Sequence, residues 1–492
     1  MSRLLFGTAV TAVLAVPQAV MAACAAPRWA GRLERDLDRM AAQLDRTLKA
    51  WPVPPRRFRP EDFGHRAGAL ATAAIQQAIE ACAAAGGGTV RLAEGDYVSG
   101  TLVLRSGVML EIAEGARLLG STDLRDYPDH VARRPTVMDS NMAMNQSLIF
   151  AEGCERIGIC GKGQIDGRGT RDNFPGEETS GPTPGRPFLI RVIDCRQVTL
   201  RDIRLKDSPC WMQNYLNCED MLIDGIQVEN QANVNNDGAD IDGCRRVIVR
   251  NCHISSEDDG LCFKGASERP MERVLVENCR IYSSCNALKF GTDSQGDFRN
   301  VLVRNVELGG PAPGTRVLNM RKADGGVSWE SVDGGIVERL VVRNARIVRS
   351  ESPLFLRLGD RGRVRPEQPR PAPGVIRQIV FAHITGADNG MRGSYFTGVQ
   401  GAQIRDVLLR DVTLPMAAAD LPVLDDAAIP EKRADYPDPP MFGRANVMPA
   451  YGLWTRHVSG LTMIDVHFPR AAGESRPDVK FGPDTSGTCV RP

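Results

Sequence analysis

Three aspartates could do acid–base chemistry in this chain if the fold brings them together. Asp258 and Asp259 are adjacent in SSEDDGLCFKG, just before an apolar run that is typical of a buried strand. Asp237 lies in NNDGADI, which has the same order of acid, glycine and apolar residues. Carboxyl groups that lie close together do not ionise independently, so one can keep its proton while another is ionised. Acid/base hydrolysis of a glycosidic bond requires that combination of states.

Two simpler interpretations compete with catalysis. Asp-Gly is a common turn signal, so one such pair would indicate only a turn. Carboxylates are also calcium ligands, so the cluster could hold a cation. Because the acids recur in neighbouring segments and in one register, we favour a catalytic cluster. The sequence has no CxxC pair and no histidine cluster that would indicate a metal site, and we expect neither a metal nor another cofactor.

The acids belong to a repeat, which begins at residue 197 with QVTLRDIRLKDS and continues as DMLIDGIQVEN, RVIVRNCHISS and RVLVENCRIYSS. Its first four intervals are 23, 26, 27 and 27 residues, and later ones are lengthened by loops. Each unit holds short alternating strands and has no room for a crossover helix, so it must stack on its neighbours. The sequence predicts an all-β parallel β-helix over residues 61–415. The equivalent apolar positions are Val198, Met221, Val247, Val274, Val301, Val337, Ile379 and Val407.

Stacking brings three segments into register, namely NNDGADI, EDDGLCF and SCNALKF. Asp237, Asp259 and Asn286 then occupy equivalent positions on successive coils, about 4.8 Å apart. Simple alternation from the apolar residues that follow would turn Asp259 into the core. We therefore expect the backbone to break its pleat near Gly260, so that both Asp258 and Asp259 face the substrate.

Four cations accompany the acids. Lys264 and Lys289 should point outward, and Arg321 and Lys322 follow one coil later in VLNMRKADGG. A lysine beside acids is most often an ion-pair partner. Several cations along one groove would also suit an anionic sugar such as a uronate.

The chain has 13 cysteines, and several follow the repeat. Cys195, Cys218 and Cys244 each precede the apolar anchor of their coil by three residues, and Cys252 and Cys279 each follow it by five. This phasing predicts ladders of small buried thiols, as opposed to disulfides or metal ligands.

The first 22 residues read as a secretory signal peptide, with a basic start, an apolar core and a small-residue cleavage site. We expect a secreted or periplasmic protein; a lipoprotein anchored through Cys24 is the alternative. The formal net charge of +1 gives no global field for nucleic acid or an anionic membrane. Apart from that anchor, the expected partner is a substrate, and we expect a monomer.

Segments outside the repeat should cover it. Residues 23–60 combine a helix over 29–51, with its leucines on one face, and a proline-rich linker. The helix should pack on the domain surface, with dimerisation as the alternative. A second helix over 72–85 should cap the first coil. Residues 416–492 lose the repeat and are expected to form an irregular extension.

The motifs resemble those of a known family. NNDGADIDGC followed by SSEDDGLCFKG resembles the NTDGxD and DD motifs of glycoside hydrolase family 28, the polygalacturonases and rhamnogalacturonan hydrolases of the pectin lyase-like β-helix superfamily. The stretch TAAIQQAIEACAAAGGGTVRLAEGDYVSG is similar to the N-terminal region of its bacterial members. The resemblance covers roughly residues 60–410. It implies a right-handed parallel β-helix and inverting, metal-free hydrolysis of a pectin-like polysaccharide.

The resemblance also implies roles for single residues. Asp258 would be the general acid, Asp237 and Asp259 would activate water, and Asn235 matches the leading asparagine of the first motif. Two departures bear on the substrate. Asn286 stands in place of the histidine of the usual Gly-His-Gly motif, a histidine that rhamnogalacturonan hydrolases also lack. The Arg-x-Lys motif is replaced by the adjacent cations Arg321 and Lys322. The candidate substrate-binding residues are Asn235, Lys264, Asn286, Lys289, Arg321 and Lys322.

An exported glycoside hydrolase acting on a galacturonate-containing polysaccharide is the function that these features favour. The alternatives are a polysaccharide lyase and a non-catalytic carbohydrate-binding β-helix protein.

Overall fold

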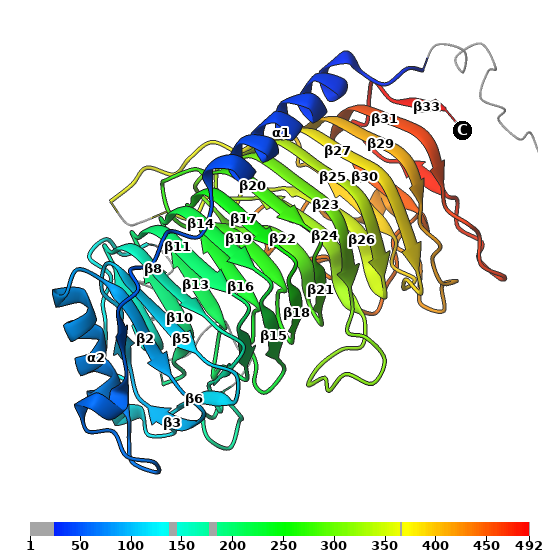
Figure 1. Ribbon diagram of the computed structural model, residues 1–492. Helices are drawn as coiled ribbons and strands as arrows, with labels where there is room; N and C mark the ends of the chain where they lie inside the picture. The colour runs from blue at the N-terminus through cyan, green and yellow to red at the C-terminus, as the bar shows by residue number, and fades with distance from the viewer. Residues whose placement is uncertain (1–23, 137–144, 177–184, 365–366, 492) are drawn as a thin grey trace, which may run out of the picture.

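The computed structural model describes residues 24–136, 145–176, 185–364 and 367–491. The predicted signal peptide lies outside them. The chain winds into a long solenoid whose strands pair in parallel with those of the preceding and following coils (Figure 1). This is the predicted parallel β-helix. Two sheets carry it, and the apolar core runs continuously between them from the first coils to the last.

One sheet has twelve strands, in the order of the coils. They are β4 (Leu102–Val103), β7 (Ser147–Glu152), β10 (Phe188–Ile193), β13 (Gln213–Leu216), β16 (Ala239–Asp242), β19 (Leu261–Gly265), β22 (Asn286–Ser294), β24 (Ala323–Ser331), β26 (Ser350–Leu358), β28 (Ser394–Thr397), β30 (Leu453–Arg456) and β32 (Val479–Phe481).

The remaining strands form the second, 21-stranded sheet. They are β1 (Arg57–Phe58), β2 (Gly88–Leu92), β3 (Gly95–Ser99), β5 (Val108–Ile112), β6 (Ala116–Gly120), β8 (Glu155–Cys160), β9 (Gln164–Asp166), β11 (Arg196–Arg201), β12 (Arg204–Lys206), β14 (Glu219–Asp224), β15 (Gln227–Asn230), β17 (Arg245–Arg250), β18 (His253–Ser256), β20 (Met271–Glu277), β21 (Arg280–Ser283), β23 (Phe298–Gly309), β25 (Ile336–Val348), β27 (Val375–Ala387), β29 (Ile404–Thr413), β31 (Val458–His467) and β33 (Cys489–Arg491). Three short 3₁₀ turns are η2 (Pro60–Phe63), η3 (Leu124–Asp126) and η4 (Asp426–Ala428).

The sequence repeat and the strand register agree at all but one coil. The anchors from Val198 to Val301 pair in one ladder, and this ladder continues to Ile379 and Val407. Between them, Val301 pairs with Leu340, whereas the predicted Val337 pairs with Phe298 at the start of the strand. The prediction slipped by three residues because both valine and leucine lie inside the same long, apolar β25.

Helix α2 (Thr72–Ala84) closes the first coil, as expected. Its residues Ile75, Ala78, Ile79 and Cys82 are buried in the main core. An open solenoid end exposes apolar side chains and unpaired strand edges, so this cap removes both. Figure 1 shows α2 at the blue end of the molecule.

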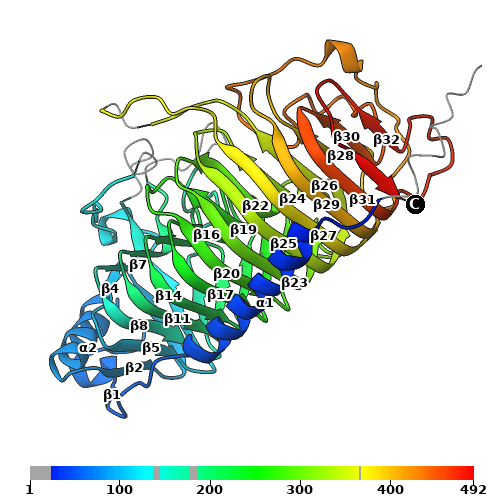
Figure 2. The same ribbon diagram turned by 90° about the horizontal axis from the view of Figure 1, so that it is seen from above.

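Helix α1 (Arg28–Thr47) lies across the outside of the 21-stranded sheet, over β17, β20, β23, β25 and β27 (Figure 2). Its leucine face packs on an outward row of apolar side chains from successive coils. Acids of the helix also pair with arginines of the coils, as in Glu34–Arg410 at 2.7 Å and Asp36–Arg339 at 3.1 Å. The apolar face is therefore used within the chain, which favours surface packing over a dimerisation helix.

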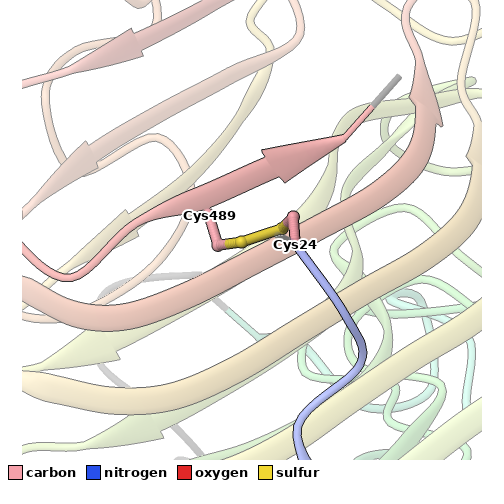
Figure 3. The surroundings of a disulfide bond; sticks show 2 residues. All are labelled: Cys24 and Cys489. Atoms are coloured by element: carbon pink, nitrogen blue, oxygen red, sulfur yellow. A yellow bond between two sulfur atoms is a disulfide. The ribbon is translucent and has the colours of Figure 1, made fainter. Parts of the chain in front are cut away.

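The two ends of the described chain are joined by a disulfide between Cys24 and Cys489 (Figure 3). A lipid thioether on Cys24 would need the same sulfur atom, so this bond opposes the lipoprotein alternative. The cysteines of the predicted ladders are all free and buried, which confirms the thiol ladders. Cys24 and Cys489 stand outside those ladders, so the repeat contained no signal for their pairing.

The C-terminal region differs from the expected irregular extension. After β29 the chain leaves the coils for residues 414–452, which we call the 414–452 segment, and then adds further coils with β30 to β33. Figure 2 shows this segment in orange, on the side of β26, β28 and β30. In the part of the chain that the structure describes, no helix is long and apolar enough to cross a bilayer.

Candidate active site

The three predicted acids lie at the start of neighbouring strands of the 12-stranded sheet. Ala239 pairs with Leu261, and Leu261 with Leu288, which places Asp237, Asp259 and Asn286 at one level of successive coils. Backbone hydrogen bonds continue this register, from Gly238 N to the Asp259 carbonyl and from Gly260 N to the Asn286 carbonyl. The predicted alignment of the acids is confirmed.

Glycines beside the acids break the pleat, as expected. A Cβ on Gly260 would lie 2.6 Å from the Ile281 side chain and 2.5 Å from the Ala287 carbonyl, so this position faces the packed interior. Leu261, the next residue, is also in the core. Because two consecutive residues face inward, the alternation is reset and Asp259 is turned away from the core. Gly238 makes the same close approach one coil earlier.

Asp259 is held as an anion by two donors on the next coil. Lys289 Nζ lies 3.1 Å from its Oδ2, and Asn286 Nδ2 donates to its Oδ1 at 2.9 Å. Burial alone would raise the pKa of Asp259, but the charges of Lys289 and Lys264 outweigh burial and lower it. This carboxyl group is therefore ionised over the physiological range.

The pKa values of Asp258 and Asp237 are raised, in contrast to that of Asp259. Burial and the neighbouring Asp259 charge raise the pKa of Asp258 to about 6. Burial, with Asp240 and Asp258 nearby, raises the pKa of Asp237 well above its usual value. The three acids thus combine proton-holding carboxyls with an ionised one, which is the combination that glycoside hydrolysis needs. Of the two predicted water activators, Asp259 has the lowered pKa and Asp237 the raised one.

Access also separates the three acids. Asp258 is partly exposed, whereas Asp237 is 2% and Asp259 is 3% exposed. The Asp259 backbone N–H donates to Asp258 Oδ1 at 2.9 Å, and the Ser256 and Ser283 hydroxyls donate to the Asp258 carbonyl. Asp258 is therefore the most accessible of the three acids, and its loop is held by Ser256 of its own coil and by Ser283 of the next coil.

Oxygens of Asp258 and Asp259 and the sulfur of Cys285 lie within 4.8 Å of one another, close enough to share a metal ion. Calcium prefers six to eight oxygen ligands, and a thiol is a poor one. A cation between the two carboxylates would also have to displace the Lys289 ammonium from Asp259. The donor set therefore fits calcium poorly.

The part of the chain that contains these acids matches a family model. The model of Glycosyl hydrolases family 28 matches residues 110–329, a range that contains Asp237, Asp258 and Asp259. Over these residues, which are less than half of the chain, the sequence is similar to this family. A curated relative is exopolygalacturonase X-1 of Emericella nidulans, 29% identical over 233 residues, which are 43% of this chain and 50% of that protein. The chain thus spans about half the length of the relative that it matches.

Solved structures agree on the fold. An exopolygalacturonase from Thermotoga maritima superposes with a TM-score of 0.64, at 18% identity, over 87% of this chain and 96% of that one. PfbA, a surface protein and adhesin of Streptococcus pneumoniae, superposes with a TM-score of 0.52, at 14% identity, over 86% and 100%. The fold is the right-handed parallel β-helix. Since an adhesin shares it, function has to be argued from the site.

Asn286 stands where the family 28 motif has histidine, and its amide is held in one orientation. Ser328 Oγ donates to Asn286 Oδ1 at 2.7 Å, so the amide nitrogen is turned toward Asp259. An amide supplies hydrogen-bond donors without a charge that changes with pH. Compared with a histidine at this position, Asn286 still donates a hydrogen bond to Asp259 but does not titrate.

The four predicted cations differ in whether they contact the acids. Lys289 and Lys264 are at the site, where Lys264 Nζ lies 3.1 Å from Asp240 Oδ1 and 4.7 Å from the centre of the Trp211 ring. Trp211 is 4% exposed, so its ring supports Lys264 and is closed to a sugar. Arg321 is exposed and donates to the Thr315 carbonyl within its own loop.

Lys322 follows Arg321 on the approach to β24, and the structure records no contact between either residue and the acids among the described residues. Neither stands in the strand ladder that carries the site, because β24 begins only at Ala323. Their role in substrate binding stays a prediction.

Asn235 is turned toward the protein. Its Oδ1 accepts from Arg186 Nη2 at 2.7 Å, and Arg186 also donates to the Val234 carbonyl. Arg186 is buried and lies 49 residues before Asn235, so no local pattern linked the two. Asn235 thus anchors the loop that carries Asp237, and direct substrate binding by it stays a prediction.

Two acids at the site were missed. Asp240 follows Ala239 and precedes Ile241, both in the core, so strict alternation would have placed it outward beside the other acids. Burial raises its pKa to about 7 against the pull of Lys264. Asp438 comes from the 414–452 segment, and its Oδ1 lies 3.0 Å from Lys289 Nζ and 3.2 Å from Asn286 Nδ2. No repeat or motif marks Asp438.

Proposed function

We propose that the chain is a glycoside hydrolase that acts on a galacturonate-containing, pectin-like polysaccharide. The observation that carries this proposal is the pairing of a partly exposed, proton-holding Asp258 with a buried, ionised Asp259. The match to the family 28 model and the polygalacturonase names of the relatives support the reaction class and the substrate class.

In this mechanism Asp258 gives its proton to the glycosidic oxygen as the bond from that oxygen to the anomeric carbon breaks. Asp259 takes a proton from a water molecule whose oxygen bonds to the anomeric carbon. One water is consumed, and each product carries a hydroxyl where the bond was. Lys289 and Asn286 keep Asp259 ionised and oriented until it accepts the proton.

The surroundings of the acids favour attack at a chain end. Outward-facing side chains on both sides of the site are buried, as Arg191 and Asn214 are toward the first coils and Phe355 and Tyr395 are toward the last. Phe355 and Tyr395 are covered by the 414–452 segment, with which they share an apolar cluster. Among the described residues, these positions of the sheet face are therefore closed to a long polymer, whereas the partly exposed Asp258 is open to a chain end. We accordingly propose an exo mode.

The proposal is tested by incubating the protein with a panel of pectic polymers. We expect new reducing ends, release of small saccharides from chain ends and no unsaturated product. NMR of the first product should show inverted anomeric configuration, although Asp258 and Asp259 oxygens lie within 4.8 Å and many inverting pairs are about 6.5–9.5 Å apart. Unsaturated products lost on adding EDTA would instead indicate a lyase, and binding without new reducing ends a carbohydrate-binding protein.

The pH dependence should follow Asp258. Its carboxyl must be protonated to act as the acid, and its pKa is about 6, so kcat/KM should fall about tenfold per pH unit above that value. Asp259 must be ionised, and its pKa lies below the usual 3.8, so the acid limb should lie below that value. Initial rates across pH measure both limbs, with tryptophan fluorescence at each pH as the control for unfolding. A rate that rises above pH 6 would contradict the assignment.

A further inference from the structure

Asp438 occupies the hydrogen-bond donors that a substrate carboxylate would use at this site. Its Oδ1 lies between Lys289 Nζ, at 3.0 Å, and Asn286 Nδ2, at 3.2 Å. Both donors also face Asp259, at 3.1 Å and 2.9 Å. One ammonium and one amide are therefore shared between two protein carboxylates.

The amide has no hydrogen to spare. A side-chain amide has two N–H bonds, and Asn286 Nδ2 already lies within hydrogen-bond distance of three acceptors, on Asp259, Asp438 and Cys285. The amide is prevented from turning round, because Ser328 donates to its oxygen. A substrate carboxylate would have to displace one of these acids to gain this donor.

The charges at the site also disfavour a substrate carboxylate. Lys264 pairs with Asp240, and Lys289 pairs with both Asp259 and Asp438, so two lysines face three carboxylates. Lys264 and Lys289 are 6% and 1% exposed, and water screens such buried charges weakly. An anionic group brought beside Asp438 would meet like charge, a device by which proteins reject unwanted ligands.

The segment that supplies Asp438 is seated tightly. A Cβ on Gly325 of β24 would collide with Ser328 Oγ and Asn286 Oδ1 and would lie 3.2 Å from Pro439 Cγ, so the bare glycine leaves room for their hydrogen bond with the proline packed beside it. The Tyr395 hydroxyl donates to the Pro439 carbonyl. Tyr436, 57% exposed, presents its ring 5.6 Å from Lys289 Nζ. The segment therefore brings both a carboxylate and an exposed aromatic ring to the site.

We propose that Asp438 is a specificity-determining residue that excludes a uronate carboxylate, so that the sugar bound beside Lys289 and Asn286 is neutral. This inference rests on the proposed function and names the class of sugar at that site. It concerns a residue outside the range that matches family 28. The polymer then contains galacturonate elsewhere and a neutral hexose or deoxyhexose at this position.

The test compares two polymers that differ only in charge: polygalacturonate, and the same preparation after chemical reduction of its carboxyl groups to hydroxymethyl groups. The readout is the ratio of the two kcat/KM values, which is insensitive to the fraction of folded enzyme. We expect the wild type to favour the reduced polymer by tenfold or more, because one like-charge contact at low dielectric has about that effect or a larger one.

The Asp438→Asn variant keeps the shape of the side chain and removes its charge. We expect it to shrink the preference about tenfold, chiefly by raising kcat/KM on polygalacturonate. Asp438→Glu keeps the charge and should keep the preference. Asp435→Asn is the matched control, since Asp435 lies in the same segment, has a half-exposed side chain and pairs with Lys432.

Two results would overturn the inference while leaving the hydrolase intact: a wild type that prefers polygalacturonate, or an Asp438→Asn variant with an unchanged ratio. If neither these two polymers nor any of the pectic panel yields reducing ends, the proposed function fails, and this inference fails with it.

Discussion

Replacing Asp258 by asparagine should lower kcat on a pectic polymer by several hundredfold or more, within the range of about 10²–10⁴ that general acid catalysis contributes. The amide has the shape of the carboxyl group but has no proton to give to the leaving oxygen. The amide oxygen can still accept the hydrogen bond that the Asp259 backbone N–H donates to Asp258 Oδ1, so the loop should keep its conformation.

The Asp258→Asn variant has a distinctive second property. An aryl glycoside with a good leaving group needs little protonation, so the variant should hydrolyse it at a rate close to that of the wild type. Asp202→Asn is the control, because Asp202 lies in a turn with its side chain 57% exposed and pairs with Arg201, its neighbour in sequence. Retained activity on the polymer would reject Asp258 as the acid. Retained sugar binding, with no turnover even in the wild type, would favour the carbohydrate-binding alternative.

Replacing Asp259 by asparagine should also lower kcat by about 10²–10⁴, but on every substrate. The loss occurs because the pKa of Asp259 is lowered, whereas the pKa values of the other two predicted catalytic acids, Asp258 and Asp237, are raised. The pKa of Asp237 is raised well above its usual value, which favours its neutral form, and a neutral carboxyl group is a poor acceptor for the water's proton.

The aryl glycoside distinguishes this variant from the first. Asp259→Asn should be as slow on the aryl glycoside as on the polymer, since water must be activated in both reactions. The comparison uses initial rates on both substrates, with circular dichroism to check the fold. A variant that recovers on the aryl glycoside would reverse the roles of Asp258 and Asp259. If Asp237→Asn were slower than Asp259→Asn, Asp237 would be the base.

Much of the fold could be read from the sequence because neighbours in a solenoid are also neighbours in the repeat. The spacing of Val198, Met221 and Val247 is the length of one coil, so alignment of segments is alignment in space. The same argument predicted that Asp237 and Asp259 lie on adjacent strands and that Gly260 breaks the pleat. The alignment was wrong where an insertion lengthens a coil: Val337 was aligned with Val301, whose partner is Leu340.

The composition of the site was predicted in part. Lys289 and Asn286 belong to the repeat and were found in register, and Asp240 could have been found from its place between Ala239 and Ile241. The sequence could not predict which of the acids has a raised pKa and which a lowered one, since this depends on burial and on which lysine contacts which acid. Lys289 lowers the pKa of Asp259, while Asp258, its immediate neighbour in sequence, has its pKa raised.

By itself, the sequence determined the coils, the capping helix and the row of acids, because each of these follows from a period or a motif only a few residues long. The tertiary structure alone decided that Asp438 reaches Lys289 across 149 residues and that Cys24 meets Cys489 across 465. Such contacts join non-repeating segments to the coils. No period relates their partners, so their pairing depends on the path of the whole folded chain.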